Sequence, residues 1–231
     1  MPNRPAGPGG GGPSTSRRQF VLAASALSSV GLARLRASAA ETGDVQQTTP
    51  SRQYITFEAP INETTTSRLI AVVGGSIQKG VNDIHLIVGS GGGSISAALL
   101  VYGFLRSLPA KVTTYNLSTI QSAGEIIFLA GEHRIASQNA IFMFHHLNQN
   151  VTGNTAMTTA DFKDREMFLS MDIKRVDDIY RERTSLTAAQ MEEFKQHAVY
   201  FDAVAARDAG IIQEIAPLSI PARAAITAVN P

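Results

Sequence analysis

The 231-residue chain contains no cysteine. This absence excludes disulfide bonds, thiolate metal sites and cysteine nucleophiles. Metal-ligand spacings such as His-Glu-x-x-His are also missing, so we expect no metal site. No Gly-Lys-Ser/Thr loop for ATP and no complete Gly-x-Gly-x-x-Gly fingerprint for a dinucleotide occurs, so we expect no cofactor. Charged residues make up only 17% and hydrophobic residues 44%, which is typical of a compact globular domain.

The first 39 residues have the pattern of a signal peptide. Arg17 and Arg18 precede an apolar run of about 13 residues, and Ala37-Ser38-Ala39 is a small-residue cleavage pattern. The run is shorter than the about 20 residues that cross a bilayer, so no membrane span is expected after cleavage. The paired arginines resemble the twin-arginine signal, which predicts a periplasmic or secreted protein. The alternative is a disordered basic tail on a cytoplasmic protein.

Export would change the charge of the protein. Removal of residues 1–39 takes away five arginines and no acid from 20 basic and 19 acidic residues, so the formal net charge goes from +1 to −4. A mildly acidic surface argues against nucleic acid as a partner.

Beyond this segment we expect a polar lead-in over 40–52, one domain over 53–218 and a tail over 219–231. Within the domain, apolar runs alternate between strand and helix periodicity. This alternation predicts an α/β fold with a mainly parallel sheet. The strands are expected at 54–57, 84–88, 112–116, 134–136, 141–145 and 211–215, and the helices at 62–74, 95–109, 122–130, 158–183, 187–196 and 202–210.

Three features between Gly89 and His146 suit a serine hydrolase. The glycine turn 89–93 follows a buried strand and precedes a helix, so its amides favour a phosphate or a developing oxyanion. Ser122 stands between a strand and an apolar helix, where it either caps the helix or acts as a nucleophile. His145 ends an apolar strand and is a candidate general base.

These residues resemble the Clp protease proteolytic subunit family, within the wider Clp/crotonase superfamily. Ser90-Gly91-Gly92-Gly93 is similar to the family's Ser-Pro-Gly-Gly turn, with glycine in place of proline. Gln121-Ser122-Ala123-Gly124 is similar to its Ala-Ser-Met-Gly motif, and Met143-Phe144-His145-His146 to Met-Ile-His-Gln. The resemblance implies a spiral of β-β-α units with a long protruding helix. It also implies Ser122 as nucleophile, His145 as base, and an oxyanion hole formed by the amides of Gly93 and Ala123.

The third member of the family's catalytic triad is missing. Counting back from Gly210, the family's aspartate position falls on Ala198. Asp202 matches a helix-capping serine of the family, so it is either a cap or, after a register shift, the third triad member. Loss of the carboxylate that orients the histidine costs up to about 10⁴ in turnover.

The sequence therefore leaves three functions open. The first is a serine peptidase that acts on peptides or proteins through an acyl-enzyme on Ser122. The second is a weak or inactive pseudo-peptidase that serves assembly or binding, and the lowest-ranked is a crotonase-like acyl-CoA enzyme. The resemblance also implies a homo-oligomeric ring, with the helix from Thr158 contributing contacts between rings. Export would separate the protein from an ATP-driven unfoldase, because the periplasm lacks ATP.

Overall fold

The computed structural model describes residues 52–147 and 156–229, which lie within one compact unit, Gln47–Pro231. The predicted signal peptide, residues 1–39, lies outside the described residues. The same holds for the lead-in except Arg52, which is the first residue of β1 (Arg52–Glu58). Among the residues that the structure describes, no helix is both long and apolar enough to cross a membrane.

A six-stranded sheet forms the centre of the fold, in the order β8-β5-β3-β2-β1-β9, and every neighbouring pair is parallel. A second sheet, β4-β6-β7, pairs β4 with β6 in parallel and β6 with β7 antiparallel. The predicted α/β class with a mainly parallel sheet is confirmed. The remaining strands are β2 (Asp83–Gly89), β3 (Lys111–Asn116), β4 (Thr119–Gln121), β5 (His133–Ala136), β6 (Ile141–Phe144), β7 (Val199–Asp202), β8 (Glu214–Ile215) and β9 (Ala225–Val229).

Six helices are present in the described part of the chain, each close to its predicted position. They are α1 (Glu63–Gln78), α2 (Ile95–Arg106), α3 (Ala123–Leu129), α4 (Thr159–Arg183), α5 (Ala188–Glu193) and α6 (Ala203–Asp208). Asn62, Thr158 and Thr187 begin α1, α4 and α5 with reciprocal capping boxes. Such local bonds satisfy the first amides of a helix, which is why these starts were readable from sequence.

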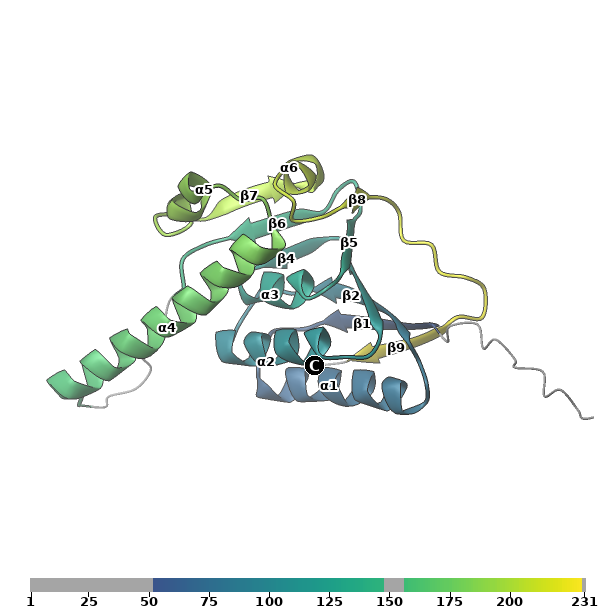
Figure 1. Cartoon of the computed structure of the whole chain (residues 1–231), viewed down its shortest axis with the longest axis horizontal. Helices are drawn as coiled ribbons and strands as arrows, with labels where there is room; N and C mark the ends of the chain where they lie inside the picture. The colour runs from purple at the N-terminus through teal and green to yellow at the C-terminus, as the bar shows by residue number, and fades with distance from the viewer. Residues whose placement is uncertain (1–51, 148–155, 230–231) are drawn as a thin grey trace, which may run out of the picture. The chain divides into compact units, whose positions relative to one another are not determined.

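The hydrophobic core lies between the large sheet and the helices α1, α2 and α3 (Figure 1). Leu86 of β2, Leu69 of α1 and Ile127 of α3 are fully buried there. On the opposite face of the sheet, a hydrogen bond of 2.7 Å joins His85 Nδ1 and the Tyr115 hydroxyl. His85, Tyr115 and Tyr54 are buried on this face as well, so the middle strands carry buried side chains on both faces, as expected for parallel strands.

The predicted tail over 219–231 was wrong for residues 225–229, because these form strand β9 beside β1. The pairing matches Gln53 with Ala225 and Phe57 with Val229. Sequence pattern alone does not reveal this strand, since its stability comes from backbone bonds to a distant partner.

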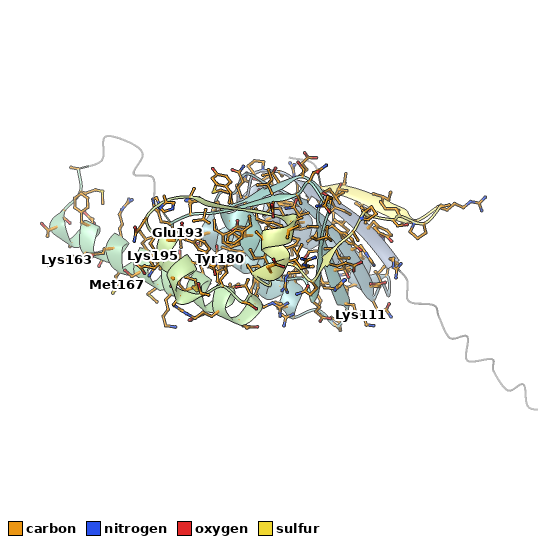
Figure 2. The ribbon with its side chains drawn as sticks, turned by 90° about the horizontal axis from the view of Figure 1, so that it is seen from above. Lys111, Lys163, Met167, Tyr180, Glu193 and Lys195 are labelled. Atoms are coloured by element: carbon orange, nitrogen blue, oxygen red, sulfur yellow. The ribbon has the colours of Figure 1, made fainter. Side chains whose placement is uncertain are left out.

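Helix α4 extends away from the sheets at its N-terminal end, and only its C-terminal turns pack on the core (Figures 1 and 2). Its buried residues begin at Asp172 and include Val176, Ile179 and Tyr180. The extended part exposes large apolar side chains, namely Phe162, Met167, Phe168 and Met171. A protruding helix with an unpaired apolar surface is a feature of chains that bind a partner there.

Candidate active site

Ser122 lies at the start of α3 but does not cap it. The serine has φ 56° and ψ −126°, and its side chain makes no capping hydrogen bond. Its backbone amide donates to the carbonyl of Met143 at 2.9 Å, which fixes the turn against β6. A non-glycine residue at positive φ costs about 1–3 kcal/mol and persists only where its surroundings impose it. The capping interpretation therefore does not explain the conformation of Ser122.

The glycine turn lies directly against this serine. A Cβ atom built on Gly92 would lie 2.7 Å from Cβ and 3.2 Å from Oγ of Ser122, so only glycine allows this approach. A hydrogen bond within the turn stabilises its conformation, because the Gly92 amide donates to Ser90 Oγ at 3.1 Å. Ser90 in turn donates its hydroxyl to the Ala59 carbonyl at 2.7 Å.

The amides of Gly93 and Ala123 are the two candidate oxyanion donors. Ile61 forms a parallel bridge with Gly93, in which Ile61 bonds to the carbonyl of Gly92 and the amide of Ser94. In such a bridge the amide of the middle residue points to the other side, away from Ile61. Ala123 is the first residue of α3, so its amide has no acceptor within the helix.

His145 follows β6 and lines a cavity of about 230 Å³. Val176, Tyr180 and Phe194 make the wall apolar, and the His145 ring stands perpendicular to that of His146 at 5.8 Å. Within the described residues, no hydrogen bond joins His145 to Ser122. In the parallel register Gln121 pairs with Met143, so Ser122 and His145 follow the ends of two neighbouring strands, one and two residues beyond this pair.

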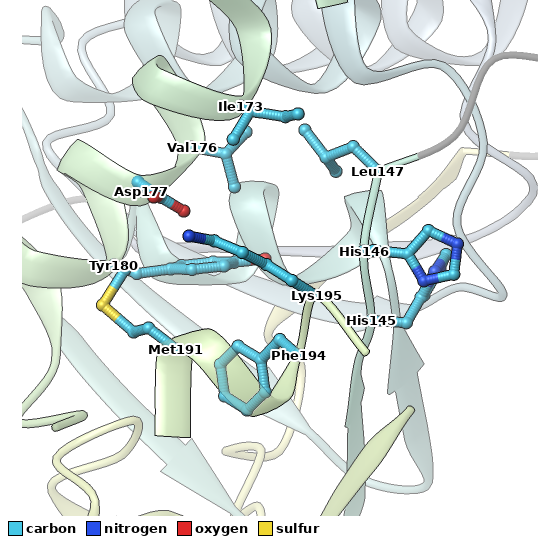
Figure 3. A pocket seen from close by; sticks show the side chains of 10 residues that line it. All are labelled: His145, His146, Leu147, Ile173, Val176, Asp177, Tyr180, Met191, Phe194 and Lys195. Atoms are coloured by element: carbon cyan, nitrogen blue, oxygen red, sulfur yellow. The ribbon is translucent and has the colours of Figure 1, made fainter. Parts of the chain in front are cut away.

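No carboxylate is paired with His145 in the part of the chain that the structure describes. Phe144 pairs with Val199 in the antiparallel ladder, so one further step brings His145 opposite Ala198. Continuing the register thus places the position singled out by sequence opposite the histidine, and an alanine occupies it. Asp177 lines the same cavity, but Figure 3 shows it across the cavity from both histidines.

Asp202 has another role in this structure. Its carboxylate accepts from the Ala205 amide at 2.8 Å and caps α6. In the ladder it pairs with Ile141, at the opposite end of β6 from His145. The capping role accounts for Asp202, and its position disfavours a contact with His145.

Glu125 is a buried acid that the sequence analysis overlooked. It lies three residues after Ser122, only 1% exposed, in a helix whose other residues are apolar or small. Tyr180 of α4 donates its hydroxyl to Glu125 Oε2 at 3.3 Å, and Oε1 has no hydrogen-bond partner among the described residues. Burial raises the pKa of Glu125 well above 4.5, although the Tyr180 hydroxyl and the nearby Met143 backbone act in the opposite direction. A lone acid within an apolar helix was the available signal.

The raised pKa of Glu125 predicts that the protein loses stability as pH rises. The folded state keeps the proton that the unfolded state releases above about pH 4.5, so folding stability falls from there toward the folded-state pKa. Replacement Glu125→Gln keeps the shape without a charge and should flatten this dependence. Urea unfolding of both proteins at pH 5 and pH 8 measures it, and equal pH dependence of the two would contradict the assignment.

No cluster of three or more histidine, cysteine or acidic side chains suited to a metal is found among residues 52–147 and 156–229. The site thus consists of a strained serine, two candidate oxyanion donors (the Gly93 amide of the glycine turn and the Ala123 amide of α3), and a histidine that lines a largely apolar cavity. These groups suit acyl transfer by a serine nucleophile.

Comparison with known proteins shows which family the chain resembles. The model of the family "Clp protease" matches residues 37–218. The ATP-dependent Clp protease proteolytic subunit 3 of Streptomyces avermitilis is 28% identical over 58% of this chain and 61% of its own length. Subunit 2 of Corynebacterium glutamicum is 25% identical over 62% of this chain and 71% of its own length. The alignment with the first relative thus spans less than two thirds of that protein.

A solved structure agrees on the fold. A ClpP1 variant from Listeria monocytogenes superposes with a TM-score of 0.61 at 19% identity, covering 71% of this chain and 90% of that one. The expected ClpP-like fold is confirmed by this superposition. Because the family model covers most of the chain, including the glycine turn, Ser122 and His145, the chain belongs to the Clp protease family.

Proposed function

We propose that this chain is a serine peptidase that hydrolyses peptide bonds through an acyl-enzyme on Ser122. The observation that carries the proposal is the conformation of Ser122, held at φ 56° with its hydroxyl withheld from the helix it precedes. A serine that served only as a cap would adopt an extended conformation and bond to the helix. The relatives, which are proteolytic subunits by name, support the same chemistry.

The proposed reaction uses the groups in a fixed order. Ser122 Oγ attacks the peptide carbonyl while His145 takes the hydroxyl proton, and the developing oxyanion lies between the amides of Gly93 and Ala123. His145 then gives the proton to the leaving amine, and a water molecule activated by the same histidine releases the acid product. The missing Ser122–His145 hydrogen bond must form when substrate binds, as catalytic hydrogen bonds often tighten only in the complex.

A pseudo-peptidase is the second candidate, and Ala198 favours it. Without a carboxylate beside His145, the histidine lacks the partner that fixes its tautomer and stabilises its charged form. The acyl-CoA reading ranks lowest, since it assigns no role to the strained hydroxyl of Ser122.

A fluorophosphonate probe distinguishes these candidates, because it reacts only with an activated serine hydroxyl. The folded protein should become labelled on Ser122, and Ser122→Ala should abolish the labelling. Ser107→Ala is the matched control, since Ser107 is an exposed serine at the end of α2 that does not line the His145 cavity. A folded protein that resists the probe would rule out the peptidase and leave the pseudo-peptidase.

We further propose that the protein works as a homo-oligomeric ring outside the cytoplasm. The exposed apolar side chains of α4, Phe162, Met167, Phe168 and Met171, support an oligomer, since burying them against another copy removes them from water. The Arg17-Arg18 pair with its apolar run supports export. An exported ring would take peptides or proteins as substrates without an ATP-driven unfoldase.

A further inference from the structure

A second hollow lies beside Gln121, the residue that precedes Ser122, and shares no lining residue with the His145 cavity. It has a volume of about 350 Å³ and is lined by Glu58, Gly91, Ser118, Thr119 and Gln121, among others. We call it the polar groove. Glu58 is the single charged residue among those that line it.

The backbone around the polar groove is held by hydrogen bonds. The Gln121 amide donates to the Ser90 carbonyl at 2.9 Å, and the Ser90 amide donates to the Thr119 carbonyl at 3.4 Å. These bonds tie β4 to the end of β2 at an isolated bridge between Ser90 and Ile120. The groove is therefore formed before any ligand arrives, which lowers the entropic cost of binding.

Two residues that line the polar groove are each next to a residue of the proposed active site. Gln121 immediately precedes Ser122, and Gly91 immediately precedes Gly92, whose Cβ position lies 3.2 Å from Ser122 Oγ. An extended peptide advances about 3.3 Å per residue. When the scissile carbonyl of a substrate lies at Ser122, a substrate side chain about one or two residues away from that bond therefore reaches the polar groove.

Glu58 gives the polar groove its charge. Its side chain lies over Gly89, with Cγ 3.5 Å from the position of a Cβ on that glycine, and its carboxylate is exposed. Among the described residues, the Glu58 carboxylate makes no ion pair and no hydrogen bond. A carboxylate without a partner in a groove of otherwise neutral residues attracts a cation.

We propose that the polar groove binds the side chain of a substrate lysine or arginine, and that Glu58 determines this preference. The inference rests on the proposed function for its placement next to the scissile bond. Glu58 acts on specificity alone, since it touches neither Ser122 nor His145. The serine and threonine hydroxyls and the amide of Gln121 supply further acceptors for the hydrogens of the cation.

Binding to the Ser122→Ala protein tests this without requiring turnover. Fluorescent peptides that differ only by lysine, glutamine or glutamate at one position are titrated by anisotropy, with that position moved in single steps along the peptide. At one or two positions lysine should bind roughly two- to five-fold more tightly than glutamine, the range of a solvent-exposed ion pair, and glutamate more weakly. Adding Glu58→Gln should remove the preference, and Glu58→Lys should reverse it.

Glu132→Gln is the matched control. It removes the same charge from an exposed glutamate before β5, at the opposite end of the strands, and should leave the preference unchanged. Equal binding of the three peptides, or a lysine preference that survives Glu58→Gln, overturns the inference. Cleavage of the same peptides by the natural chain is measured separately. Absence of cleavage counts against the proposed function alone, because the binding result stands without it.

Discussion

An Ala198→Asp variant should cleave peptides about 10²- to 10⁴-fold faster than the natural chain. The antiparallel ladder ends at the pair Phe144↔Val199, and continuing its register by one step places His145 opposite Ala198. Directly opposite residues project side chains to the same face of a ladder, with Cβ atoms about 5 Å apart. A carboxylate at position 198 would reach the imidazole, fix its tautomer and stabilise its protonated form.

The measurement is kcat/KM on a quenched fluorescent peptide. Ala198→Asn provides the control, because it has the size of the aspartate without the charge, and should gain far less. Asp202→Asn keeps a good helix cap but removes the carboxylate, so it should leave turnover unchanged if Asp202 serves only α6. If the aspartate and asparagine variants at position 198 cleave equally fast, a missing carboxylate is not what limits this chain.

A Gly93→Ala variant should be severely destabilised, by roughly 3–5 kcal/mol, and should lose labelling by the serine probe. A Cβ atom on Gly93 would lie 2.1 Å from the carbonyl oxygen of Ile61, and the residue has φ +146°. The obstacle is backbone rather than a flexible side chain, so the turn itself has to move. Native domains have only about 5–15 kcal/mol of stability, so this is a large fraction of the total.

Gly91→Ala is the natural comparison, since it changes the same turn by the same methyl group. No atom lies within 4 Å of a Cβ on Gly91, and its φ lies outside the left-handed region. This variant should keep its melting temperature within a few degrees and retain labelling. Thermal unfolding followed by circular dichroism measures the melting temperature of both variants, and the serine probe measures their labelling. Similar losses in the two variants would show that the Ile61 contact is not the cause.

The sequence was sufficient for the parts of the fold that depend on local chemistry. The capping boxes at Asn62, Thr158 and Thr187 use side chains within three residues, and each helix begins where expected. The short strands β4 and β7 were not predicted, because three or four residues carry too little periodicity. Their pairing with β6 is decided by contacts between distant segments.

The candidate site was predictable in its residue types but not in its geometry. Motif resemblance singled out Ser122, His145 and the position of Ala198. The register of β6 with β7, continued by one residue, agrees that position 198 lies opposite His145. No pattern in the sequence indicates that Ser122 adopts positive φ, since that strain is imposed by Gly92 and by the bond to Met143. The polar groove was equally hidden, because its walls come from three separate strands and loops.

The pairing of β9 with β1 has a consequence for the order of events at the ribosome. Gln53 donates to the Ala225 carbonyl across 172 residues of sequence, so the outer edge of β1 stays open until the residues of β9 have been synthesised. Contacts of such long separation slow folding, and an open strand edge invites mispairing meanwhile. The sheet is therefore complete only once residues 225–229 have been made and have paired with β1. If the proposed export holds, a route that carries finished folds would suit such a late pairing.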